Sequence, residues 1–224
     1  MLCSKSPATA TFRAGYSASS STSARRERAY HASSRDVRLS FWYPVVSTQY
    51  AFSPKGYVVV GRNDAYSIEL VKDGALVGVF EHDADPVEVL PGEAEEWNDW
   101  AEYFARRLGV PNDYGSPPKL KPWFKALHVG RMGRIWVHRY ALAEERAAPE
   151  QTPGHDRPTL VWRERATYDV FEEDGTFLWT VVMPWNTVVH ARSGDTLWAV
   201  QVTDDGEHVV RFRVRPLAVS NAQN

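Results

Sequence analysis

The sequence predicts an all-β protein of repeated antiparallel units with one inserted α-helix. From about residue 47 onward, short runs rich in β-branched and aromatic residues alternate with turn residues such as Gly, Asp and Pro. Strand–turn–strand segments of similar pattern recur three times in this part of the chain. Between the first two recurrences, the apolar residues change to the three- and four-residue spacing that is typical of a helix.

The composition supports a folded core and excludes several classes of protein. Of the 224 residues 43% are hydrophobic, with 9 Trp, 10 Tyr and 9 Phe, which excludes a wholly disordered chain. The single cysteine, Cys3, excludes an internal disulfide and a cysteine-rich zinc site. The 26 basic and 28 acidic residues give a net charge of −2, and this balance gives no reason to expect nucleic acid as a partner. No membrane span is expected, because no apolar run reaches ~18 residues.

Residues 1–46 and 218–224 are expected to be disordered tails on either side of one folded unit, residues 47–217. The first 40 residues are rich in Ser, Ala and Arg and show no apolar periodicity. They cannot bury enough surface to offset the entropy lost on ordering. No continuous apolar segment follows the positive start, so a signal peptide is not expected. The Arg- and Ser-rich, acid-poor composition resembles that of an organelle transit peptide, which is the alternative to a plain tail.

Three segments share one hairpin pattern, a short strand, a turn with Gly and a second β-branched or aromatic strand. They span residues 50–61, 126–137 and 188–200. In the first two units an Asp-Gly pair follows between alternating strands, at positions 73–74 and 174–175, and such a pair is a strong hairpin signal. Each of these two units therefore predicts four antiparallel strands. The third unit predicts three strands, and a fourth is missing.

Tandem units of four antiparallel strands are the signature of β-propeller blades, so the sequence predicts a partial β-propeller of about three meander blades over residues 47–217. With residues 133–137, 168–171 and 174–175, the chain resembles bacterial six-bladed β-propellers of the NHL-like type, and it corresponds to the C-terminal half of such a ring. The resemblance implies that the last blade borrows its outer strand from the N-terminus. It also implies an exported bacterial protein, whereas no signal peptide is found, so the location stays open.

Residues 93–108 are expected to form the inserted helix. Acidic residues open this segment and Arg106 and Arg107 close it, which matches the helix dipole, and Gly109 marks its end. Four large apolar residues form one stripe along it: Trp97, Trp100, Phe104 and Leu108. The stripe predicts a cap packed over one mouth or edge of the blades, with a docking helix or lid as the alternative.

Residues 144–158 are expected to form an exposed loop that interrupts the second unit. The segment is polar, with three prolines and one glycine. Long loops of this kind often carry binding, but the segment contains no recognisable motif.

A weak metal candidate follows the first unit. His82, Asp83, Asp85 and Glu88 offer nitrogen and oxygen ligands that a hard cation could use, although their spacing does not match an EF-hand loop. The alternative is a solvated acidic loop. The sequence contains no zincin motif, no nucleophile elbow and no glycine-rich phosphate loop, so no catalytic set and no cofactor is predicted.

Two further groups are candidates for binding. His128 and His190 occupy matching positions in the first strands of the second and third units, where they could line a common axis. Arg211, Arg213 and Arg215 alternate with apolar residues, which places three guanidinium groups on one face of a strand. That face predicts a site for an anion or an acidic partner, or an exposed edge whose charge discourages strand pairing.

The sequence therefore predicts a ligand- or protein-binding or scaffold module. The alternative is a remnant or half of a six-bladed propeller hydrolase or lyase, lactonase-like, that is active only as an assembled ring. An incomplete ring exposes a blade face that would otherwise be covered, and exposed apolar patches mark interaction sites. We therefore expect self-association through such a face, or an unknown protein partner.

Overall fold

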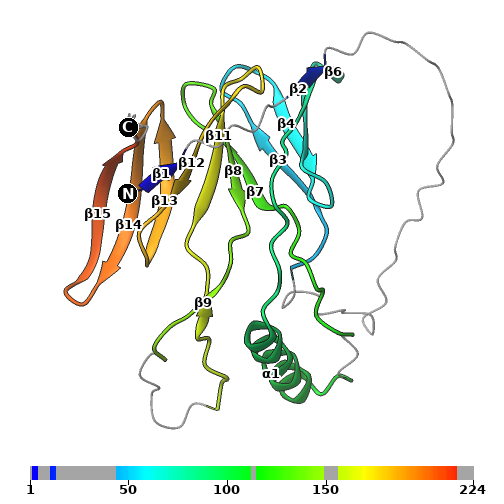
Figure 1. Cartoon of the computed structure of the whole chain (residues 1–224), viewed down its shortest axis with the longest axis vertical. Helices are drawn as coiled ribbons and strands as arrows, with labels where there is room; N and C mark the ends of the chain where they lie inside the picture. Colours follow the sequence, from blue (N-terminus) through cyan, green and yellow to red (C-terminus); the bar gives the residue numbers. More distant parts are fainter. Residues whose placement is uncertain (1, 5–10, 14–43, 112–114, 149–155, 216–224) are drawn as a thin grey trace, which may run out of the picture.

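The computed structural model describes residues 2–4, 11–13, 44–111, 115–148 and 156–215. Within these residues the chain forms antiparallel β-sheets and one α-helix, which confirms the all-β prediction (Figure 1). The predicted C-terminal tail and most of the predicted N-terminal tail lie outside the described residues.

The first sheet is the predicted first unit. Its four consecutive strands run in the order β6-β5-β4-β3. The backbone turns at Gly56 with a φ of 85° and at Gly74 with a φ of 77°, conformations that glycine adopts without steric cost. The strands are β3 (Thr48–Phe52), β4 (Val58–Arg62), β5 (Ser67–Lys72) and β6 (Ala75–Glu81).

The middle sheet is the predicted second unit, in the order β12-β11-β8-β7. Its strands are β7 (Phe124–Val129), β8 (Ile135–Arg139), β11 (Thr167–Phe171) and β12 (Phe177–Val182). The segment between β8 and β11 contains a small ribbon of β9 (Glu144–Glu145) and β10 (Trp162–Arg163). The start of the predicted loop, residues 144–148, is exposed as expected, but its first two residues pair with β10 rather than remaining irregular.

The third sheet has three strands, as predicted for the third unit. They run in the order β13-β14-β15 and are β13 (Thr187–Ser193), β14 (Thr196–Thr203) and β15 (Gly206–Arg213).

Two short N-terminal strands correct the prediction that residues 1–46 lack regular structure. Strand β1 (Leu2–Ser4) pairs with β12, and β2 (Thr11–Arg13) pairs with β6, so each adds a fifth strand to the outer edge of a sheet. An outer edge presents unpaired N–H and C=O groups, which accept any extended backbone whatever its apolar pattern. Composition therefore could not reveal this pairing.

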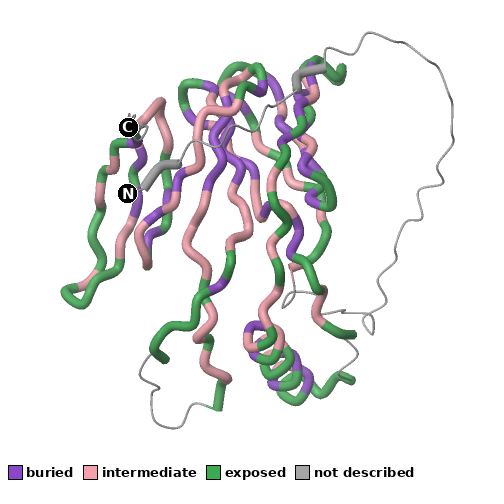
Figure 2. Tube along the Cα trace, in the orientation of Figure 1, coloured by how far each residue is buried: buried purple, intermediate pink, exposed green. Residues whose placement is uncertain are grey.

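The three sheets are stacked, with the middle sheet between the other two (Figure 1). Alternate side chains of the middle sheet point to opposite faces, and each face packs on a neighbouring sheet. One core joins it to the first sheet through residues such as Ile68, Phe80 and Phe171. The other joins it to the third sheet through residues such as Trp136, Val170 and Leu197. Figure 2 shows the buried residues concentrated in these strands.

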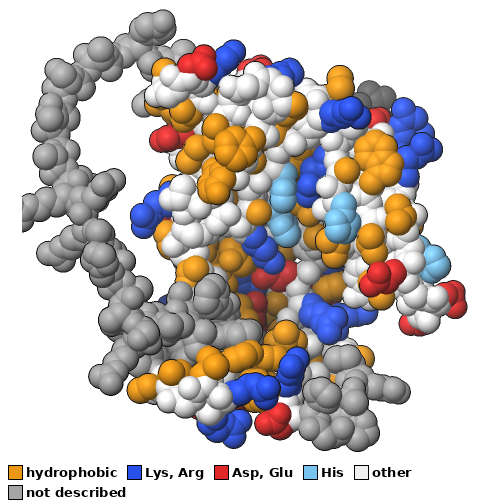
Figure 3. All heavy atoms as spheres, turned by 180° about the vertical axis from the view of Figure 1, so that it is seen from behind, with side chains coloured by type: hydrophobic (Ala, Val, Ile, Leu, Met, Phe, Trp, Pro, Cys, Tyr) orange, Lys and Arg blue, Asp and Glu red, His pale blue; other side chains and the backbone are white. Residues whose placement is uncertain are grey.

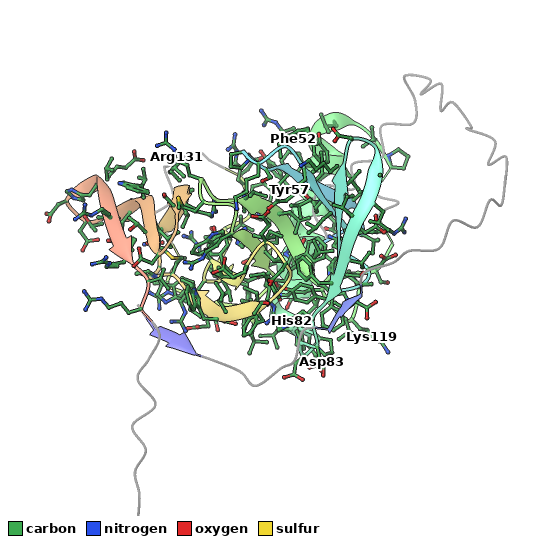
Figure 4. The ribbon with its side chains drawn as sticks, turned by 90° about the horizontal axis from the view of Figure 1, so that it is seen from above. Phe52, Tyr57, His82, Asp83, Lys119 and Arg131 are labelled. Carbon is green, nitrogen blue, oxygen red and sulfur yellow. The ribbon has the colours of Figure 1, made fainter. Side chains whose placement is uncertain are left out.

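The first strands of the three sheets converge. Strands β3 and β4 contact β7, and the backbone N–H of Arg131, after β7, donates to the carbonyl oxygen of Arg192 in β13 at 2.9 Å. Seen from above, Phe52 and Arg131 lie at one edge of the molecule, and His82 and Asp83 lie at the opposite edge (Figure 4). The sheets thus form a fan whose first strands share one edge.

Helix α1 (Pro91–Leu108) confirms the predicted helix and begins two residues earlier, because Pro91 takes its first position and the Glu93 side chain caps the backbone N–H of Leu90. It ends at Gly109, which has a φ of 64°. The predicted stripe is not the buried face. Its three aromatic residues are half-buried and Leu108 is 54% exposed. The buried residues are Glu93, Glu96, Ala101, Tyr103 and Ala105.

The orientation of α1 follows from its acidic residues. The Glu96 carboxylate accepts hydrogen bonds from the backbone N–H groups of Val161 and Trp162 at the base of the ribbon. Gly92 lies against the Trp162 ring so closely that a Cβ there would come within 2.6 Å of it. The polar contacts of Glu96 therefore determine which face of the helix is buried, and the spacing of the apolar residues does not reveal these contacts.

Candidate interaction surfaces

The stack of three sheets leaves one outer face on each end sheet. The cross-strand pairs identify the outward residues of the first sheet, because opposite residues point to the same face. One row pairs Phe52 with Val58, Val58 with Val71 and Val71 with Leu76, and a second row contains Glu69 between Val60 and Val79. We call this surface the first outer face: Tyr50, Phe52, Val58, Val60, Glu69, Val71, Leu76 and Val79.

Large apolar side chains on the first outer face are exposed. Phe52 is 72% exposed and Tyr50 is 64% exposed, and the two rings meet edge to face with centroids 5.8 Å apart. Leu76 is 52% exposed. The valines of β4 between them are half-buried. The face is therefore an apolar surface with one acidic residue within it.

The third sheet has an equivalent surface. Val188 is opposite Val200, Val200 is opposite Val209, and Trp198 is opposite Arg211. Val209 is 81% exposed. We call this surface the second outer face: Val188, Trp198, Val200, Val202, Glu207, Val209, Arg211 and Arg213. From behind, hydrophobic side chains are visible on the surface of both end sheets (Figure 3).

The arginines of β15 lie on one face of the strand, as their alternation with apolar residues predicts. Arg211 and Arg213 point to the second outer face, and Arg213 pairs with Asp195 at 3.1 Å. Arg215 is exposed just after β15. Among the described residues, Arg211 has no ion-pair partner and neither does Glu69 on the first outer face. Glu69 and Arg211 are thus unpaired charges of opposite sign on the two outer faces, and the second face also carries Glu207, which has no ion-pair partner among the described residues.

The two predicted histidines have different surroundings. His190 is exposed at a register shift between Val189 and Ala191. His128 is half-buried on the middle sheet, and its ring neighbours are His138 and Tyr168. Neither histidine forms an ion pair with a carboxylate in the described part of the chain. The expectation that they line a common axis receives no support from these contacts.

The metal candidates do not converge. His82 is 7% exposed, whereas Asp83, Asp85 and Glu88 are exposed. His82 stacks on Phe177 with ring centroids 4.6 Å apart, and in Figure 4 Asp83 points out from the edge of the molecule. The cause is strand alternation, because Phe80 in β6 points into the core and His82 follows it by two residues. Within residues 44–111, 115–148 and 156–215, no group of three or more His, Cys, Asp or Glu side chains could hold a metal.

His82 belongs instead to a buried polar cluster around Asp169. This carboxylate is fully buried and accepts hydrogen bonds from the Tyr66 hydroxyl at 2.8 Å and the Thr180 hydroxyl at 2.6 Å. Arg139 Nη1 lies 3.3 Å from it and His82 Nε2 lies 3.8 Å from it. Burial lowers the pKa of His82 and raises the pKa of Tyr66, so both are neutral at pH 7. The cluster links the first sheet to the middle sheet.

A second polar cluster attaches α1 to the middle sheet. The buried Lys121 ammonium lies 2.7 Å from Glu93 and 2.8 Å from Glu164, and it donates to the carbonyl oxygen of Ala141 at 3.0 Å. Lys125 also pairs with Glu164, at 2.8 Å. Burial acts to raise the pKa of Glu164, but Lys125 and Lys121 outweigh it and lower that pKa. No local motif predicts this cluster, because its members come from distant segments.

No protein-family model matches the chain, and no curated protein or solved structure matches it either. The resemblance to six-bladed propellers of the NHL-like type therefore stays a prediction. In the part of the chain that the structure describes, no helix is both long and apolar enough to span a membrane.

Proposed function

We propose that the protein is a binding or scaffold module that self-associates, with the first outer face of one copy packed on the second outer face of another. The observation that carries this proposal is the apolar character of both faces of each end sheet. The core covers one face of each. The other face has no described partner.

Strand β4 illustrates the argument for the first sheet. In an antiparallel sheet with one solvated face, apolar and polar residues alternate. In β4, however, Val58, Val59 and Val60 are consecutive, and only Val59 points into the core. The neighbours in adjacent strands, Phe52 and Leu76, extend the apolar surface outward. Such a sequence is typical of a sheet that is covered on both sides.

Strand β14 repeats the pattern in the third sheet. Leu197 and Ala199 point into the core, whereas Trp198 and Val200 point outward. Contiguous exposed apolar patches on a protein surface mark interaction sites. Covering them contributes about 25 cal/mol for each Å² of apolar surface removed from water.

Charge favours contact between unlike faces over contact between like faces. Glu69 lies within the apolar row of the first outer face, and Arg211 lies beside Trp198 on the second. Opposite charges across an interface select the correct partner and register, whereas like charges oppose the alternative pairing. Each copy has one face of each kind, so in a two-fold pair whose fans open toward one another both contacts form at once.

Light scattering after size-exclusion chromatography tests the proposal on the full chain. The wild type is expected to be a dimer at micromolar concentration, and F52E and V209E are expected to be monomers, because each places a charge in an apolar contact. Met132 is 63% exposed on the turn between β7 and β8, so M132E serves as the control and is expected to stay dimeric. A wild-type monomer with a cooperative melt would contradict the proposal.

A charge-exchange experiment distinguishes this interface from any other dimer interface. E69R and R211E are each expected to weaken the dimer, because each places like charges opposite one another. The double variant restores the pair in reversed order and is expected to recover most of the loss. Additive loss in the double variant would show that the two faces do not meet.

A further inference from the structure

An open, solvent-facing hollow of about 620 Å³, here called the cavity, lies at one end of the interface between the middle and third sheets. Four elements line it: the turn after β7, strand β12, the turn between β13 and β14, and the end of β15. The lining residues are Arg134, Trp179, Gly194, Asp195, Arg213, Val214 and Arg215.

The charge of the lining is strongly biased. It contains three guanidinium groups and one carboxylate. The carboxylate of Asp195 is occupied by Arg213 at 3.1 Å, which lowers the pKa of Asp195 through this hydrogen bond. Arg215 has no ion-pair partner among the residues that the structure describes. Glu172 pairs with Arg134 in the same way, so Arg215 is the uncompensated positive charge of the lining, and a guanidinium group stays charged across the physiological range.

One wall of the cavity is aromatic and already holds a cation. The Arg134 guanidinium carbon lies 5.3 Å from the centre of the Trp179 ring. Glu172, outside the lining, accepts hydrogen bonds from Arg134 Nε at 3.0 Å and lies 2.9 Å from Nη2. These contacts orient the guanidinium plane against the indole ring and make the wall rigid.

The guanidinium groups that line the cavity are all hydrogen-bond donors, so a ligand that fits it accepts hydrogen bonds.

The backbone holds the arginines of the third sheet in place. The N–H of Val214 donates to the carbonyl oxygen of Asp195 at 2.7 Å, which ties the end of β15 to the turn between β13 and β14. Arg213 and Arg215 therefore leave a strand end whose position is fixed by the sheet rather than by a free loop. A site on a rigid element loses less entropy when a ligand binds.

We propose that this cavity binds a small oxyanion ligand, a phosphate or carboxylate carried on a planar or aromatic group. Arg215 and Arg213 hold the oxyanion, and the Arg134–Trp179 wall stacks on the planar part. This proposal does not rest on self-association, because no residue of the cavity except Arg213 belongs to an outer face.

Tryptophan fluorescence of the full chain, titrated with phenyl phosphate and with inorganic phosphate, tests the proposal. Both probes are expected to give a saturable change, and phenyl phosphate is expected to bind at least about fivefold more tightly because it reaches the aromatic wall. R215Q is expected to weaken binding about tenfold, the usual loss for one charge-assisted hydrogen bond. W179L removes the aromatic wall and is expected to lower the affinity for phenyl phosphate more than the affinity for inorganic phosphate.

Controls separate the cavity from general attraction of anions. Arg131 lies on the same turn as Arg134 and is exposed but does not line the cavity, so R131Q is expected to bind like the wild type. The monomeric variant V209E is expected to bind equally well, which distinguishes failure of this site from failure of the dimer. No saturable signal with either probe, or equal loss in R215Q and R131Q, would overturn the proposal.

Discussion

The Tyr66 hydroxyl donates a 2.8 Å hydrogen bond to Asp169 Oδ2 across the interface between the first and middle sheets. Both side chains are buried, and Asp169 is fully buried. The same carboxylate also receives the Thr180 hydroxyl and lies beside Arg139. One carboxylate therefore organises polar groups from both sheets inside an otherwise apolar core.

Removing either member of this pair is expected to destabilise the fold. D169A leaves the half-buried Arg139 without its charge partner and the buried Tyr66 hydroxyl without its acceptor, which costs about 3–5 kcal/mol in the free energy of unfolding. Y66F leaves the carboxylate with one donor fewer and costs about 1–3 kcal/mol. Urea denaturation at pH 7 measures both. Y50F is the matched control, since Tyr50 is 64% exposed on the same sheet, and its effect is expected to stay within about 0.5 kcal/mol. Equal effects of Y66F and Y50F would contradict the assignment.

The strands were predictable because their signals are local. The Asp-Gly pair at 73–74 and the one at 174–175 set their own turns, as the left-handed φ of 77° at Gly74 and 85° at Gly175 shows. The apolar runs between such turns then define the strands of each sheet. The helix was predictable for the same reason, because its end signals lie at Gly109 and in its charged ends.

The sites were less predictable because they depend on distant partners. His82 stands beside acidic residues in the sequence, yet in the fold it faces Asp169 in another sheet. Lys121 has no local signal, because its carboxylate partners come from α1 and from the segment after β10. In β4, three consecutive valines do not indicate which face is the core. Which face of β4 is buried, and which distant residues become partners, is decided only when the sheets pack together.

Lys121 is expected to be the most sensitive lysine of the chain. K121M removes the ammonium and leaves Glu93 and Glu164 with less compensation in a buried site, which costs about 3–5 kcal/mol. Lys119 is two residues away and exposed (Figure 4), so K119M is the matched control with an expected effect below about 0.5 kcal/mol. Thermal or urea unfolding gives the comparison. If K121M unfolds like K119M, the buried cluster does not hold α1 on the middle sheet.

Gly175 is expected to tolerate no side chain. An added Cβ would lie 2.6 Å from Cβ of Phe80, and the φ of 85° is unfavourable for other residues. G175A therefore combines backbone strain of about 1–2 kcal/mol with overpacking of about 1–3 kcal/mol. G74A has a similar φ of 77° but open space around the added Cβ, so it isolates the backbone contribution. Equal losses of stability in the two variants would show that the turn does not press on the first sheet.

Acid is expected to destabilise the fold through its half-buried histidines. Burial lowers the pKa of His128 to about 4, with Arg192 adding to the effect. Burial, together with Lys125 and other nearby cations, lowers the pKa of His138 to about 3. Unfolded histidine has a pKa of about 6.5, so below that pH the unfolded state binds more protons than the folded state. Stability is therefore full above pH ~6.5 and falls as the pH decreases toward the folded pKa values.

For each histidine, we expect the free energy of unfolding to fall by about 1 kcal/mol per pH unit as the pH decreases from ~6 to ~4. This is somewhat less than the slope for a fully buried group, because each ring keeps some exposure to solvent. Urea denaturation at pH 7 and at pH 5 measures the loss. H138Q is expected to lose less stability over this interval than the wild type, because its carboxylates titrate in the same way and only the imidazole is absent. H190Q is the control, since His190 is exposed, and its pH dependence is expected to match the wild type. If H138Q and H190Q respond identically, His138 is not kept neutral by its position between the middle and third sheets.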